Sequence, residues 1–142
     1  MAQPLPAHLF PVTDATVLEL YEFVFAPWVK DLGLRDFSVS QGRASALLPQ
    51  KDALKFCSGA VCGQVIMSAV DTVVSIAMAT SERPMKGTIY QHTHFLRPAL
   101  NDNFRIEATV LRFGKATAYA EARVTFAASG ELVAHSTAEF AF

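Results

Sequence analysis

The segment Ala60-Val-Cys-Gly-Gln-Val-Ile-Met-Ser-Ala-Val-Asp-Thr-Val-Val-Ser-Ile-Ala-Met-Ala79 is the most apolar stretch of the chain, and it contains a single carboxylate, Asp71. A segment of roughly 20 residues is long enough to cross a bilayer. Gln64, Asp71 and the serines argue against contact with lipid, so we predict a buried helix of a soluble domain. A carboxylate in such a helix is costly unless it is paired, and unpaired ones are often functional.

The segments around this helix predict strands and one further helix. Thr13 and Asp14 are expected to cap a helix that ends near Phe25, where Pro27 breaks or redirects it. Residues 35–48 predict a strand pair, or one strand with a bulge near Gly42, and residues 49–58 a polar loop. Beyond the helix the periodicity changes to two, which predicts four long strands over residues 88–96, 103–113, 117–127 and 132–142.

Short turns join the last strands, so the four strands are expected to form an antiparallel meander. One long apolar helix and an antiparallel sheet pack best when the curved sheet wraps the helix. The prediction is a single α+β domain over residues 1–142.

The composition and the start of the sequence bear on partners and location. The chain has 142 residues, 12 basic against 13 acidic, so it has no broad cationic field for nucleic acid. Its 51% hydrophobic content favours association of subunits. The start of the sequence does not resemble a signal peptide, and two cysteines without zinc or redox spacing are typical of a reduced cytoplasmic protein.

The buried helix has a polar stripe. Four residues are spaced by four, three and four positions and therefore share one helix face: Gln64, Ser68, Asp71 and Ser75. Such a stripe must contact water, a partner or a ligand. Two interpretations stay open from periodicity alone: a structural carboxylate bonded to the sheet, and a functional one.

The start of the helix offers a second candidate. Glycine at Gly63 lets a ligand approach the backbone, where first-turn N–H groups have no intrahelical acceptor. A helix N-terminus attracts developing negative charge, so this is a candidate oxyanion site.

Four stretches together resemble one family. Cys62-Gly-Gln-Val-Ile-Met-Ser-Ala-Val-Asp-Thr72 is similar to the His-Gly-Gly…Ala-Asp-Thr segment of hotdog-fold acyl-CoA thioesterases of the phenylacetate-pathway (PaaI-like) subfamily. His94-Phe-Leu-Arg-Pro98, Leu111-Arg-Phe-Gly-Lys115 and Gly130-Glu-Leu-Val-Ala134 resemble later segments of that family in the same order. The resemblance implies a hotdog fold and hydrolysis of an acyl-CoA thioester, with CoA entering as substrate and no cofactor required.

The resemblance also implies roles for residues. Asp71 corresponds to the catalytic carboxylate, the Gly63 N–H to the donor for the thioester oxygen, and Thr88 to a hydroxyl that positions water, while Ser75 lies one turn beyond the acid. Two departures stand out: the family's histidine is Cys62 here, and its second glycine is Gln64. In addition, the asparagine often found upstream in the family, which helps to hold the carbonyl or the water, aligns near Phe56. Gln64 is a candidate replacement amide donor. For the CoA phosphates the candidates are Lys115, Arg97 and Arg112.

The helix geometry requires two chains. Gly63 and Asp71 are eight residues apart, or about 12 Å along the helix axis, whereas a reacting carbon must lie within about 3 Å of both nucleophile and oxyanion donors. If both act, they come from different protomers of a homodimer with two equivalent sites. Association of two dimers into a homotetramer stays open.

Two histidines and a cysteine carry weaker signals. His92 and His94 share one strand face, but without a third ligand nearby in sequence a surface or subunit-contact role is favoured, and no metal site is expected. Cys62 has no local base to make it a nucleophile. The alternatives to hydrolysis are a hotdog protein that binds acyl-CoA or another apolar ligand without cleaving it, a dehydratase or hydratase, and a non-catalytic subunit.

Overall fold

The computed structural model describes residues 2–142, and its central element is the helix α3, Gly63–Met78. It begins at Gly63 because Cys62, its N-cap residue, is extended (φ −71°, ψ 153°). Most of α3 is buried, including Val70, Val73 and Ile76, so the predicted buried helix is confirmed. Within residues 2–142 no helix is both long and apolar enough to be a candidate membrane span.

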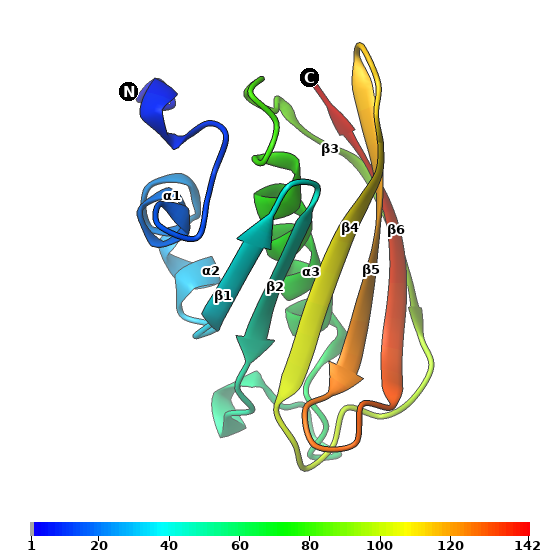
Figure 1. The fold of residues 1–142 in the computed structure, drawn as a ribbon. Coiled ribbons are helices and arrows are strands. Elements are labelled where there is room, and N and C mark those ends of the chain that lie inside the picture. The colour runs from blue at the N-terminus through cyan, green and yellow to red at the C-terminus, as the bar shows by residue number, and fades with distance from the viewer. Residues whose placement is uncertain (1) are drawn as a thin grey trace.

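Six antiparallel strands form one sheet in the order β1-β2-β4-β5-β6-β3. The sheet curves around α3 (Figure 1), as the α+β prediction requires. The strands are β1 (Arg35–Ser40), β2 (Arg43–Leu48), β3 (Gly87–Phe95), β4 (Phe104–Phe113), β5 (Thr117–Phe126) and β6 (Leu132–Ala141).

The predicted meander of four strands is wrong in one respect. β4, β5 and β6 do form a meander, but β3 pairs with β6, with Thr88 opposite Phe140 and Phe95 opposite Ala134. The segment between β3 and β4 is a crossover and not a hairpin turn. Within this crossover the Ala99 carbonyl accepts a hydrogen bond from the Val61 N–H at 2.9 Å, which ties the connection to the segment before α3.

Of the two sequence alternatives for residues 35–48, the strand pair is confirmed and the single strand with a bulge near Gly42 is wrong. β1 and β2 form a hairpin, and the register of β1 shifts between Arg35 and Ser38. Gly42 makes the turn with φ +71°, a conformation that favours glycine.

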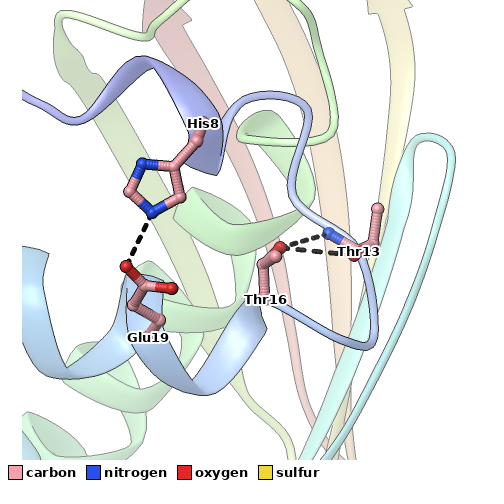
Figure 2. Close-up of polar contacts among 4 residues, drawn as sticks. All are labelled: His8, Thr13, Thr16 and Glu19. Atoms are coloured by element: carbon pink, nitrogen blue, oxygen red, sulfur yellow. Dashed lines mark hydrogen bonds and ion pairs between the residues drawn. The ribbon is translucent and has the colours of Figure 1, made fainter.

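The N-terminal segment is tied to the helix α1, Val17–Val24. The predicted capping role is wrong, because Thr16 is the N-cap residue and the Asp14 carboxylate accepts the Val39 N–H of β1 at 2.7 Å. His8 in the 3-10 helix η1 (Ala7–Leu9) lies 2.7 Å from Glu19, and Thr13 and Thr16 form a second contact (Figure 2).

Pro27 redirects the chain as expected by opening a short helix, α2 (Pro27–Lys30). The predicted loop over residues 49–58 is confirmed, with one turn of 3-10 helix, η2 (Asp52–Leu54), inside it.

The core lies between α3 and the concave face of the sheet. Its largest fully buried side chains include Phe104, Phe140, Ile106 and Ile76. Within residues 2–142, every buried polar side-chain atom has a hydrogen-bond partner. The exposed side chains of the edge strand β3 include Ile89, Tyr90 and Phe95, so one sheet edge presents apolar surface.

Candidate active site

The carboxylate of Asp71 faces the edge strand. It is half-buried on α3, and its Oδ1 accepts the Thr88 hydroxyl at 2.7 Å. No lysine, arginine or histidine among residues 2–142 forms an ion pair with it. The structure therefore brings Asp71 and Thr88 together and leaves the other carboxylate oxygen free to accept a bond from water.

The hydroxyls of the polar stripe are used inside the helix. Ser68 donates to the Gln64 carbonyl at 2.8 Å and Ser75 to the Asp71 carbonyl at 2.7 Å. Ser75 is buried and bonds the backbone of Asp71, not its carboxylate. Ser75 thus supports the helix next to the acid and is not placed to contact a substrate.

Gly63 lies at the rim of a hollow of about 410 Å³. Its N–H and that of Gln64 donate to no main-chain carbonyl within residues 2–142. The Phe95 ring covers the glycine so closely that a Cβ at this position would lie 3.2 Å from the ring. The hollow is mostly apolar and is lined by Phe56, Ala60, Val61, Gly63, Ile66, Phe95, Leu96, Arg97, Pro98 and Ala99.

Gln64 is exposed and lines a different hollow, of about 440 Å³, with Trp28, Leu54, Val65 and Ser68. The structure therefore does not bring the Gln64 side chain to the same hollow as Gly63.

The three candidate phosphate ligands lie at two ends of the sheet. Arg97 lines the Gly63 hollow and donates to the Leu132 carbonyl at the start of β6. Arg112 and Lys115 lie at the β4–β5 hairpin, at the other end (Figure 1). Along β5, Thr117 lies at the hairpin end and Thr125 lies opposite Leu132 at the other end. These eight residues of strand span about 27 Å. One chain therefore does not bring Arg97, Arg112 and Lys115 together.

Several contacts near the site had no sequence signal. Gln91 on β3 donates to the Met67 carbonyl of α3 at 3.2 Å, one turn before Asp71. Arg83 donates to the carbonyls of Gly114 and Lys115, which fixes the β4–β5 hairpin. Both partners are main-chain oxygens distant in sequence, so no spacing or residue type predicts these bonds.

Comparison with known protein families agrees with a site formed by Gly63 and Asp71. Residues 58–133, more than half of the chain, match the thioesterase superfamily. The chain belongs to the thioesterase superfamily. The match includes α3 and the strands β3, β4 and β5 in full, with both Gly63 and Asp71. No curated protein matched the chain.

Solved structures with the same fold include thioesterase superfamily members. Zebra fish thioesterase superfamily member 2 aligns with a TM-score of 0.83 and 21% identity, over 92% of this chain and 98% of that one. The PaaI protein of the E. coli phenylacetic acid degradation operon aligns with a TM-score of 0.80 and 19% identity, over 89% and 90%. Conserved protein PA5202 from Pseudomonas aeruginosa aligns at 0.77 and 25% identity, over 84% and 96%. The predicted hotdog fold is confirmed.

Proposed function

We propose that this thioesterase superfamily protein hydrolyses acyl-CoA thioesters with Asp71 as its catalytic carboxylate. The observation that carries the proposal is the 2.7 Å hydrogen bond from Thr88 to Asp71, which orients a half-buried carboxylate that has no ion-pair partner. A carboxylate held by one oxygen presents the other to a water molecule or to the thioester carbon.

Two routes from this geometry lead to the same products. As a general base, Asp71 takes a proton from water while the water oxygen bonds to the thioester carbon. As a nucleophile, it attacks that carbon itself and forms a mixed anhydride, which water then hydrolyses. In both routes the carbonyl oxygen becomes an oxyanion, the C–S bond breaks, and the thiolate takes a proton to leave as the CoA thiol beside a carboxylic acid.

The oxyanion needs donors that the Asp71 end of the helix lacks. The Gly63 N–H at the start of α3 is suited to this role, because it has no main-chain acceptor and borders an apolar hollow. Since about 12 Å of helix separates the two groups, the site pairs Gly63 of one protomer with Asp71 of its partner. The apolar edge of β3 supports such a homodimer, because an unpaired edge strand with exposed Ile89 and Tyr90 is a template for pairing with a second copy.

The dimer also accounts for the scattered cations. A twofold axis at the β3 edge reverses the partner, so the hairpin end of one protomer lies beside the Gly63 end of the other. Lys115 and Arg112 of one chain and Arg97 of the other then border the same site, where they would contact the CoA phosphates.

A second candidate is an acyl-CoA binding protein that does not hydrolyse its ligand. It is favoured by the side chains beside Gly63, where Phe56 lines the hollow and Cys62 replaces the family's histidine. Neither supplies a hydrogen-bonding group comparable to histidine or asparagine at the oxyanion.

Thiol release from short, aromatic and long acyl-CoAs separates these functions. Hydrolysis that is lost in Asp71→Asn, with the melting temperature of the wild type, supports the thioesterase. Binding of an acyl-CoA in calorimetry without release of thiol supports the second candidate. An Asp71→Asn protein that retains most of its turnover refutes the carboxylate mechanism.

A further inference from the structure

Two histidines on the edge strand face each other outside the candidate active site. His92 and His94 are exposed on β3, and their Nε2 atoms are 3.1 Å apart, with the rings at 76°. The alternate residues of the strand point the other way, because Thr93 contacts the buried Ser136 and Gln91 contacts α3. The two histidines therefore project from the opposite face of the sheet, away from α3 and Asp71.

The separation of the two nitrogens suits a shared metal ion. Imidazole nitrogens bind Zn²⁺ at about 2.0–2.1 Å. Two such bonds with their nitrogens 3.1 Å apart enclose an angle of about 98° at the metal, from the bond length above. This angle lies between those of octahedral and tetrahedral ligands. One N–H···N hydrogen bond accounts for the same distance, so the experiment must separate the two.

The surroundings leave room for an ion with further ligands. His92 and His94 line a hollow of about 280 Å³ together with His135 and Thr137. Across residues 2–142 no group of three histidine, cysteine or acidic side chains is arranged to hold a metal. His135 lies opposite His94 on β6, but its Nε2 is 3.4 Å from Glu121. The remaining coordination positions would be taken by water, as in an open site.

We propose that His92 and His94 chelate one divalent transition-metal ion per chain. Imidazole ligands suit Zn²⁺, Ni²⁺ and Cu²⁺, and the affinity should follow the general order that places Cu²⁺ first. Mg²⁺ and Ca²⁺ prefer oxygen ligands and should not bind here. His92 and His94 can bind one ion together because alternate residues of a β-strand project from the same face of the sheet.

Isothermal titration of the whole protein with NiCl₂, ZnCl₂ and MgCl₂ near neutral pH tests the site. We expect one Ni²⁺ or Zn²⁺ per chain, no Mg²⁺, and a loss of affinity of at least about tenfold in His92→Gln and in His94→Gln. His8→Gln is the matched control, because His8 is also exposed but faces Glu19 and no second histidine (Figure 2). Unchanged affinity in the His92→Gln/His94→Gln double variant would overturn the proposal.

A measurement on the wild type guards against variants that fail to fold. Substoichiometric Cu²⁺ should broaden the imidazole NMR signals of His92 and His94 before that of His8. Equal broadening of all histidine signals, or none, overturns the proposal, because paramagnetic broadening falls steeply with distance from the bound ion.

Discussion

Substitution of Gly63 by proline removes one hydrogen-bond donor from the proposed oxyanion site without breaking α3. Gly63 is the first helical residue, a position where proline is favoured because its missing N–H has no intrahelical acceptor. Proline also requires an extended residue before it, and Cys62 is extended at φ −71° and ψ 153°. The fold should therefore tolerate Gly63→Pro.

The matched control is Gly63→Ala, which adds a Cβ but keeps the N–H. That Cβ would lie 3.2 Å from the Phe95 ring, which must move by a few tenths of an ångström. The Phe95 side chain is 49% exposed and can make this shift. Both variants carry the Cβ, and the proline variant in addition lacks the donor and has a ring Cδ in place of the N–H hydrogen. Loss of one oxyanion donor costs about 10²–10³-fold in kcat, or about 3–4 kcal/mol.

The assay is steady-state thiol release from one acyl-CoA that the wild type hydrolyses, with thermal unfolding of all three proteins. We expect Gly63→Ala to stay within about tenfold of the wild type, since it retains the donor, and Gly63→Pro to fall to about 0.1–1% of its kcat. Equal kcat for the alanine and proline variants, at similar melting temperatures, would refute the role of the Gly63 N–H.

Four further substitutions test the acid and the fold. Asp71→Asn should lower kcat by about 10²–10⁴-fold in the same assay, since the amide cannot accept a proton, with thermal unfolding unchanged. Thr88→Val should lower kcat by about 10–100-fold with KM unaltered, because a hydrogen bond to a charged group contributes about 1.5–3 kcal/mol; a wild-type kcat would show that Asp71 needs no orientation. Burial raises the pKa of Tyr21 above its ordinary 10.0. The contribution of the neutral phenol to the free energy of unfolding should therefore be fully present below pH 10 and be lost as pH rises through the pKa of the folded state. Tyr21→Phe should reduce this loss, measured by urea unfolding at alkaline pH. Phe104→Ala should cost about 3–5 kcal/mol in denaturant unfolding, because the ring is fully buried.

The elements of the fold follow from local patterns in the sequence. Alternation of apolar residues located β4, β5 and β6 to within two residues, and the apolar run located α3. The pairing of β3 with β6 was not predictable in the same way, because the two strands are separated in the chain by β4 and β5 and no local pattern indicates their contact. The role of Asp14 was not predictable for the same reason. Its carboxylate accepts a hydrogen bond from the N–H of Val39, which is distant in the chain, and does not cap α1 as expected.

The candidate site was predictable where residue types recur at helical spacing. The polar stripe identified Asp71, and the family resemblance added Thr88, which the structure places 2.7 Å from it. Spacing alone could not predict which hollow each polar side chain of the stripe faces. The Gln64 side chain lines a different hollow from Gly63. His135 lies opposite His94 because β6 pairs with β3. Their proximity was therefore not predictable from the sequence either, since it depends on the pairing of distant strands.

The pairing of β3 with β6 has a consequence for synthesis of the chain. Thr88, which holds the carboxylate of Asp71, is itself held by the strand containing Phe140. While the chain emerges from the ribosome, α3 and the meander's first strands appear well before β3 has anything to pair with. The hydroxyl can therefore reach its working position only after β6 has been synthesised, and until then β3 is an unpaired apolar strand of the kind that is prone to misassembly.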